Sequence, residues 1–293
     1  MACFHPVYAF KDENGIKFLH PVDKVDANLI LPCGQCIGCR LERSRQWAVR
    51  IMHEASCFPD NSFITLTFSD EHLKPSLDYV DFQLFMKRLR KRFAPRPIRF
   101  YMCGEYGDEN RRPHYHACVF NLDFPDKVLF KRINGFPFYI SETLSQLWPF
   151  GFSTISDVTF KSAAYVARYV MKKIIGAPAE EHYKYTDPDT GEVIDLVPEF
   201  NKMSLKPGIG YTWFEKYKSD VYPHDYVIVN GYKQKPPRYY DKLLQKSDLG
   251  SAVQVEISRF EKSLKHIENN TPERLKVREE VLQAKLKHLK RSL

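Results

Sequence analysis

The feature that most constrains the fold is an ordered series of strand-like and helix-like segments between residues 62 and 120. Residues 62–68 are rich in β-branched and aromatic side chains and predict a strand, and residues 80–93 predict a helix. Residues 98–103 and 114–120 predict two more strands, and the short polar loop between them favours an antiparallel pair. Strands and helices in this order predict an α+β fold.

The rest of the chain adds elements around this series. Residues 40–57 carry apolar side chains at helical spacing, and a short helix is expected to begin near Ser141. Residues 152–158 predict a strand, and residues 161–174 predict a helix that ends at a Gly-Ala-Pro sequence. The first forty residues look irregular and turn-rich.

The composition divides the chain into three parts. Residues 1–178, which include the cysteine-rich residues 1–40, form the main domain. Residues 179–250 are rich in tyrosine and lysine and form an accessory region. Residues 251–293 have helical patterning with mixed charges, broken around residues 269–272, and form a helical extension.

The net charge of +8 favours an anionic partner, and the basic residues are unevenly placed. No acidic residue lies between Asp81 and Glu105, whereas basic residues accumulate there. A DNA phosphate backbone suits this run, although a solvated helix face is an equally good interpretation. The candidate DNA-binding residues of the predicted helix are Lys87, Arg88, Arg90, Lys91 and Arg92.

The cysteines and the apolar runs bear on the compartment. Seven cysteines, three of them close together in Cys33-Gly-Gln-Cys36-Ile-Gly-Cys39, fit a reducing compartment with a metal site better than a set of disulfides. The longest apolar runs are too short to cross a bilayer, and the N-terminus does not resemble a secretion signal. We therefore expect a cytoplasmic protein that makes no use of a membrane.

Two histidines lie two residues apart in Pro113-His114-Tyr115-His116. On a strand this spacing sends both imidazoles to the same face, where they can share one ion. Glu105 ends the preceding strand, and the loop between the strands is short enough to return it beside His114. One carboxylate and two imidazoles suit a divalent cation with open coordination positions. A bare histidine pair on a half-buried sheet is the alternative interpretation.

Two tyrosines lie four residues apart on the predicted helix 161–174. Tyr165 and Tyr169 therefore present their hydroxyls on one face, about one turn apart, and Arg168 and Lys172 each follow a tyrosine by three residues. A phenol is a poor nucleophile while protonated, and nearby positive charge favours its ionised form. Buried aromatic residues on an amphipathic helix are the simpler alternative.

Taken together and in this order, these motifs resemble the HUH endonucleases, which are named for paired histidines around a hydrophobic residue. The histidine motif precedes the tyrosines, as in the replication-initiator branch and unlike the conjugative relaxases. The paired tyrosines, the cysteine cluster and the length are most similar to the initiators of microviruses, particularly gokushoviruses. The middle residue of the histidine motif, Tyr115, departs from the pattern only in carrying a hydroxyl.

The resemblance implies a central antiparallel sheet flanked by helices, of the ferredoxin or RNA-recognition type. It also implies a Mn²⁺ or Mg²⁺ ion at Glu105, His114 and His116, with Tyr165 or Tyr169 attacking single-stranded origin DNA to leave a 5′-phosphotyrosine and a free 3′ hydroxyl. The second tyrosine would then permit strand transfer that releases a circular genome in rolling-circle replication. Lys172, or Arg168, is expected to stabilise phosphate charge.

Partners follow from what the motifs include and leave out. The sequence contains no Walker A motif, so no nucleotide cofactor or helicase activity is expected of the chain itself. A helicase and a DNA polymerase of the bacterial host are the expected partners, in the cytoplasm of that host.

The cysteine cluster suggests a separate site. Thiolates spaced as Cys33, Cys36 and Cys39 commonly supply three of the four ligands of a structural zinc ion, and Cys3 is the candidate fourth, with His5 and His20 as substitutes. Buried free thiols beside a turn, or a cluster shared with another chain, are the alternatives.

Two rival functions belong to other classes. A sequence-specific DNA-binding regulator would use the cysteines as a zinc module and the tyrosines as core residues. A hydrolase would use zinc at His114 and His116 and water in place of tyrosine.

Overall fold

The computed structural model describes residues 3–19, 27–107, 111–168, 176–187 and 190–288. Contacts divide the chain into two compact units, Ser44–Lys246 and a smaller unit of Met1–Arg43 with Ser247–Ser292. β12, from the region predicted as accessory, is part of the main sheet. The units do not follow the predicted boundaries at residues 178 and 250, which stay predictions about domains.

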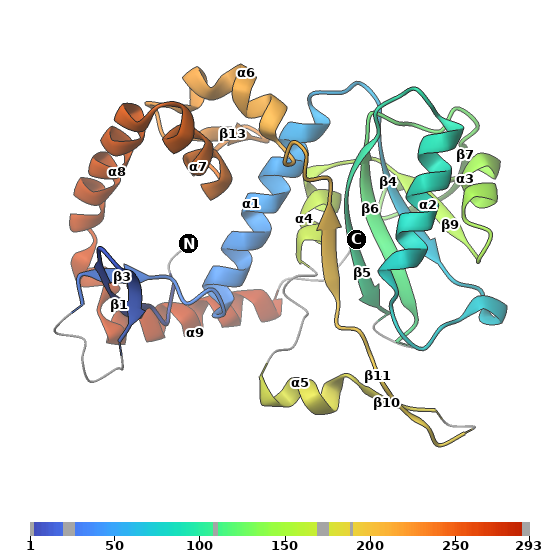
Figure 1. Ribbon diagram of the computed structural model, residues 1–293, viewed down its shortest axis with the longest axis horizontal. Helices are drawn as coiled ribbons and strands as arrows, with labels where there is room; N and C mark the ends of the chain where they lie inside the picture. Colours follow the sequence, from blue (N-terminus) through green and yellow to red (C-terminus); the bar gives the residue numbers. More distant parts are fainter. Residues whose placement is uncertain (1–2, 20–26, 108–110, 169–175, 188–189, 289–293) are drawn as a thin grey trace. The chain divides into compact units, whose positions relative to one another are not determined.

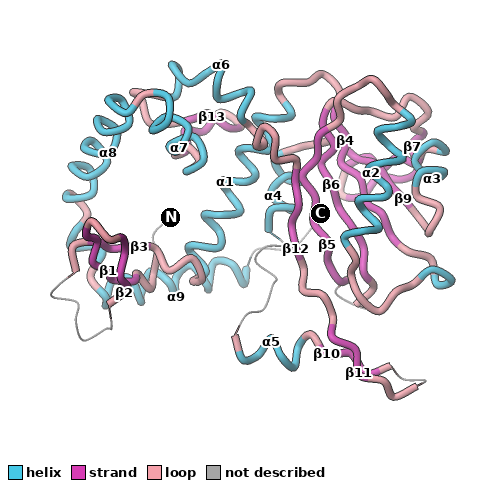
Figure 2. Tube along the Cα trace, in the orientation of Figure 1, coloured by secondary structure: helices cyan, strands magenta, loops and turns pink. Residues whose placement is uncertain are grey.

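The larger unit is built on a seven-stranded antiparallel sheet in the order β12-β5-β6-β4-β9-β8-β7 (Figure 2). The strands of this sheet are β4 (Asn61–Thr67), β5 (Arg99–Tyr106), β6 (Pro113–Phe120), β7 (Val128–Ile133), β8 (Phe136–Ile140), β9 (Ser153–Ser156) and β12 (Phe200–Met203). The predicted α+β fold is confirmed, and so is the antiparallel pairing of the two strands around the polar loop.

Helices cover both faces of this sheet (Figure 1). One face packs against α2 (Tyr79–Arg92) and α3 (Glu142–Leu147), and the other packs against α1 (Ile37–Ala55) and α4 (Phe160–Arg168). The alternation of strand side chains explains the two cores, because Ile64 and Leu66 point to the α2 side and Phe63 points to the α4 side.

The remaining elements of the larger unit lie outside the main sheet or its two cores. They are η2 (Asp70–His72), α5 (Ala177–His182), β10 (Lys184–Thr186), β11 (Val193–Asp195), α6 (Tyr211–Val221), β13 (Val227–Val229), β14 (Tyr232–Gln234) and α7 (Arg238–Ser247).

Local sequence explains where the predicted helices begin. The Asp78 side chain accepts a hydrogen bond from the N–H of Val80 at the start of α2, and Ser141 accepts one from Leu144 at the start of α3. At α4, Thr159 and Ser162 bond reciprocally, since each backbone N–H donates to the other's hydroxyl. The predicted helix 161–174 is confirmed as far as Arg168, and its continuation lies outside the described residues.

The smaller unit contains a three-stranded sheet in the order β2-β1-β3, where an irregular segment was expected. Its elements are β1 (Val7–Asp12), β2 (Gly15–Phe18), β3 (Leu29–Leu31), the start of α1, α8 (Leu249–Leu264), η4 (Ile267–Asn270) and α9 (Pro272–His288). The expected break in the C-terminal helical segment falls between α8 and α9. Among the described residues, no helix is both long enough and apolar enough to cross a membrane.

Candidate metal and nucleophile site

Neighbouring strands bring the three predicted metal ligands together. In the register of β5 with β6, Glu105 lies directly opposite His114, and His116 lies two residues further along the same face. The Nε2 atoms of His114 and His116 are 2.7 Å and 2.9 Å from the same carboxylate oxygen, Glu105 Oε1. One ligand atom from each residue thus lies within 4.8 Å of the others.

The outer nitrogens of both histidines have partners. His114 Nδ1 is 3.0 Å from the carbonyl oxygen of Arg112, which can only accept, so Nδ1 carries the proton and the neutral ring presents its Nε2 lone pair to Glu105. His116 Nδ1 is 2.9 Å from Thr65 Oγ1 on β4. Such outer hydrogen bonds fix the ring orientation of metal-bound histidines.

The donor set fits a divalent cation. Two imidazole lone pairs and a carboxylate oxygen repel one another at these distances unless protons or a cation lie among them. Burial raises the pKa of the Glu105 carboxyl, but hydrogen bonds from His114 and His116 outweigh burial and lower it to about 2. Glu105 is 2% exposed, so the negative charge is held inside the protein.

Tyr165 reaches the same site from α4. Its hydroxyl is 3.4 Å from Glu105 Oε1, and its ring meets the His116 ring edge-on with centroids 5.1 Å apart. The side chain is half-buried, and Arg168, one turn later, is exposed. Tyr169 and Lys172 lie outside the described residues.

The sheet separates the predicted basic run from this site. Phe82 and Phe85 of α2 pack on the face of the sheet opposite to Glu105, His114 and His116. Arg88 and Arg90 also donate hydrogen bonds to the carbonyl oxygens of Leu147 and Ile98 within the fold. A role for Lys87, Arg88, Arg90, Lys91 and Arg92 in DNA binding stays a prediction, and it would concern DNA away from the metal ligands.

Two contributors to the site were missed by the sequence reasoning. Phe63 stacks on the His116 ring with centroids 5.6 Å apart, and the only signal for it was the alternation of β4. Asn201 on β12 donates to the carbonyl oxygen of Val166 and so ties α4 to the sheet edge. No local motif marked Asn201, because β12 joins the sheet through a pairing of distant segments.

The four predicted zinc ligands also come together, within the smaller unit. The Sγ atoms of Cys3, Cys33, Cys36 and Cys39 lie within 4.8 Å of one another. Gly34 has a φ of 76°, so the turn after Cys33 uses the left-handed conformation that glycine adopts freely. His5 forms an ion pair with Glu279 at 2.7 Å, and His20 lies outside the described residues.

Backbone N–H groups point at the sulfur atoms of this cluster. The Cys33 N–H donates to Cys3 Sγ at 3.2 Å, and the Cys36 N–H donates to Cys33 Sγ at 3.3 Å. Burial raises the pKa of the Cys36 thiol, but N–H groups of Phe4 and Cys39 outweigh it and lower the pKa to about 7. This environment favours thiolates, the form that binds metal. Cys103 and Cys118 are buried in the main sheet, as packing residues.

Comparison with known proteins agrees with this geometry. Residues 61–174, which include all three candidate metal ligands and Tyr165, match the family model of the phage replication-associated protein ORF2. No solved structure matches the chain significantly.

Three phage proteins are similar over most of the chain. The replication-associated protein VP4 of Bdellovibrio phage phiMH2K is 36% identical over 259 residues, which cover 84% of this chain and 78% of that protein. The replication-associated protein ORF2 of Spiroplasma virus 4 is 36% identical over 275 residues, with 84% and 81% covered. The replication-associated protein ORF4 of Chlamydia phage 1 is 30% identical over 226 residues, with 74% and 54% covered.

The chain therefore belongs to the replication-associated protein ORF2 family. Within that family it is similar to the replication-associated proteins of microviruses, as its motifs predicted.

Proposed function

We propose that this protein initiates rolling-circle replication by nicking single-stranded viral origin DNA and joining one of its tyrosines to the new 5′ end. The observation that carries the proposal is the convergence on Glu105 Oε1, which lies within 3.4 Å of both histidine Nε2 atoms and the Tyr165 hydroxyl. Membership of a replication-associated family supports DNA as the substrate.

Glu105, His114 and His116 would hold the cation, Mn²⁺ or Mg²⁺. Such an ion supplies positive charge against an oxygen of the scissile phosphate and so favours attack on phosphorus. The protein fixes the three ligands through its own contacts, since Glu105 is buried and each histidine is oriented by a hydrogen bond on its outer nitrogen.

The tyrosine performs the covalent step. The phenolic oxygen forms a bond to phosphorus while the bond from phosphorus to the 3′ oxygen breaks. The phenolic proton passes to solvent, and the departing 3′ oxygen takes up a proton to become the free hydroxyl that primes synthesis. Tyr165 is placed for this role beside His116.

The second tyrosine gives the protein a means to finish the cycle. Tyr169 follows Tyr165 by four residues, so the two share a helix face wherever the helix continues. Attack by the second tyrosine on the regenerated origin would let the first adduct be rejoined as a unit-length circle. We assign phosphate charge stabilisation to Lys172, or to the exposed Arg168.

We further propose that Cys3, Cys33, Cys36 and Cys39 hold a structural zinc ion. Four convergent sulfur atoms with N–H donors directed at them fit a closed four-thiolate site. Apolar side chains surround the cluster, including Phe4, Leu275 and Leu282. Zinc would thus join the N-terminal segment to the start of α1 within the smaller unit.

The proposed function places the protein in the cytoplasm of a bacterial host. Because the chain has no nucleotide-binding motif of the Walker type, a host helicase would separate the strands and a host DNA polymerase would extend the free 3′ hydroxyl.

The test is to incubate the protein with single-stranded origin DNA and Mn²⁺ and to separate the products on a denaturing gel. A covalent protein–DNA band is expected, and EDTA should abolish it. Loss of the band in Tyr165→Phe with Tyr169→Phe, and its persistence in the control Tyr232→Phe, would support the assignment. Peptide mapping of the adduct identifies which tyrosine attacks first.

Three outcomes contradict the proposal. Binding without cleavage indicates a DNA-binding regulator, and cleavage without an adduct indicates a hydrolase that uses water. A covalent band that survives replacement of both tyrosines shows that another residue is the nucleophile.

A further inference from the structure

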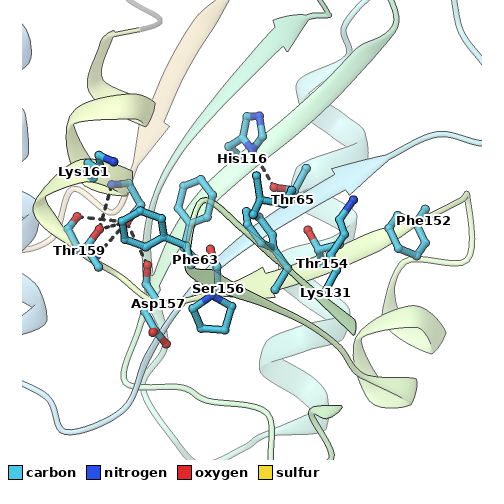
Figure 3. A pocket seen from close by; sticks show the side chains of 15 residues that line it. Phe63, Thr65, His116, Lys131, Phe152, Thr154, Ser156, Asp157, Thr159 and Lys161 are labelled. Atoms are coloured by element: carbon cyan, nitrogen blue, oxygen red, sulfur yellow. Dashed lines mark hydrogen bonds between the residues drawn. The ribbon is translucent and has the colours of Figure 1, made fainter. Parts of the chain in front are cut away.

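A pocket of about 330 Å³ lies beside the metal ligands on the α4 side of the sheet. It shares Phe63, Thr65 and His116 with the site already described. Figure 3 shows these three side chains between Lys131 and Phe152 on one side and Asp157, Thr159 and Lys161 on the other. Its volume is within the range of small-molecule sites, about 300–1,000 Å³.

The β7–β8 hairpin and the start of β9 give the pocket an aromatic wall. Phe136, Phe138 and Phe152 contribute their rings to it. Phe136 is 39% exposed and Phe152 is 52% exposed, although both are large apolar side chains. Exposed aromatic rings gathered around a concave site are typical of ligand recognition, and flat rings suit the faces of nucleobases.

The polar groups of the pocket complement a nucleotide. Lys131 and Lys161 are exposed, and Lys161 Nζ lies 4.6 Å from the centroid of the Phe136 ring. Hydroxyl groups of Thr154 and Ser156 and the carboxylate of Asp157 also line the pocket. Cations at an aromatic pocket attract phosphate, and the other groups can exchange hydrogen bonds with a base edge.

We propose that this pocket receives one unpaired base of the single-stranded DNA, from the nucleotide adjoining the phosphate at His116. This inference rests on the proposed nicking function and adds the subsite that positions its substrate. α4 links the two places, because Lys161 of the pocket and Tyr165 of the site lie four residues apart on the same helix face. A seated base therefore sets the neighbouring phosphate in front of the tyrosine, and a base held in a duplex cannot enter.

The first experiment measures DNA binding without cleavage. The full chain is mixed, in EDTA, with a short oligothymidylate that carries one 5-iododeoxyuridine, the complex is irradiated, and crosslinked peptides are identified by mass spectrometry. Crosslinks at Phe136, Phe138 or Phe152 are expected. Crosslinks found only on other elements, such as α2, would overturn the proposal.

The second experiment removes the aromatic wall. Phe136→Ala with Phe152→Ala should weaken binding of unmodified oligothymidylate about tenfold, as expected for loss of base–aromatic stacking. Tyr232→Ala is the matched control, since Tyr232 is 75% exposed and belongs to the separate β13–β14 hairpin. Its affinity should change by less than about twofold. Unchanged affinity in the double variant, with the fold verified by circular dichroism, contradicts the base pocket.

The two proposals fail in different ways. If the wild-type chain forms no covalent adduct with origin DNA but shows the expected crosslinks and loss of affinity, the nicking function is wrong and the base pocket stands. If the adduct forms and neither the crosslinks nor the double variant implicates the β7–β8 hairpin, the pocket is wrong and the nicking function stands.

Discussion

At the scale of single residues, the site depends on side chains that would never touch the cation. Thr65 and the carbonyl of Arg112 hold the outer nitrogens of His116 and His114 at 2.9 Å and 3.0 Å. These bonds decide where each Nε2 lone pair points, and the position of a lone pair determines how well an imidazole binds metal.

Thr65→Val should therefore weaken Mn²⁺ binding about tenfold, because the His116 ring loses the partner that orients it. Isothermal titration with Mn²⁺ measures the effect. Thr67→Val makes the same change two residues along β4 and serves as the control. Equal affinity in wild type and Thr65→Val would show that the Thr65 hydroxyl does not orient the ligand.

His53 is buried outside the histidine motif and affects stability in acid. Its ring stacks on Trp213 with centroids 3.5 Å apart, and its Nδ1 is 2.9 Å from the Tyr240 hydroxyl. Burial lowers the pKa of His53 from 6.5 to about 3. The unfolded chain therefore binds a proton below pH 6.5 that the folded chain does not, so acid favours unfolding.

The contribution of His53 to the free energy of unfolding should be complete above pH 6.5. It should fall by about 1.4 kcal/mol per pH unit as the pH drops below that value. Urea unfolding at several pH values, compared between wild type and His53→Phe, isolates the effect because phenylalanine keeps a ring beside Trp213. His224→Phe changes an exposed histidine and should keep the wild-type slope. An identical slope in His53→Phe would contradict the prediction.

At the scale of elements, the site requires α4 to lie at a fixed height above β5 and β6. Asn201 of β12 donates to the carbonyl oxygen of Val166 at 3.1 Å, next to Tyr165 in the chain. Ala163 and Val166 pack into the core beneath the helix. The nucleophile is thus positioned by an edge strand from a distant part of the sequence.

Asn201→Ala should slow adduct formation by about 10- to 100-fold while leaving Mn²⁺ affinity unchanged, because a small displacement of α4 misplaces the tyrosine. Lys202→Ala, on the same strand but the opposite face, is the control. Quench-flow measurement of adduct formation at saturating DNA tests the rate. Equal rates in wild type and Asn201→Ala would show that the core contacts alone position α4.

At the scale of the whole molecule, the chain contains two compact units, each with its own candidate metal centre. The histidine site belongs to Ser44–Lys246, and the cysteine cluster belongs to the unit formed by the two ends of the chain. The small three-stranded sheet and a core built around Phe4, Cys36 and Leu275 provide limited apolar burial in that unit. Small cores of this kind commonly depend on a metal for stability.

We expect about one zinc ion per purified chain, measured by mass spectrometry of metals. Removal of zinc by a chelator, or Cys36→Ser, should increase amide hydrogen exchange in β1–β3 and α9 but not in β4, β5 and β6. Cys57→Ser is the control, since Cys57 lies outside the cluster. Metal-free protein with unchanged protection in β1–β3 would rule out a structural zinc.

The sequence by itself determined the elements whose physical causes are local. Alternating side chains specified β4, β5 and β6, capping residues such as Ser141 specified where helices begin, and the spacing of His114 and His116 placed both on one face. The short loop between β5 and β6 was enough to bring Glu105 opposite His114. The candidate metal site could be predicted because all its ligands lie within one hairpin.

Only the tertiary structure decided which distant segments meet. It placed α2 and its basic run on the face away from the metal ligands, added β12 beside β5, and set the β7–β8 hairpin next to His116 to form a pocket. These arrangements depend on burial and strand pairing between segments far apart in the chain, and no local pattern encodes such pairings. The chemistry was therefore readable from the sequence, whereas the surface that would receive DNA was not.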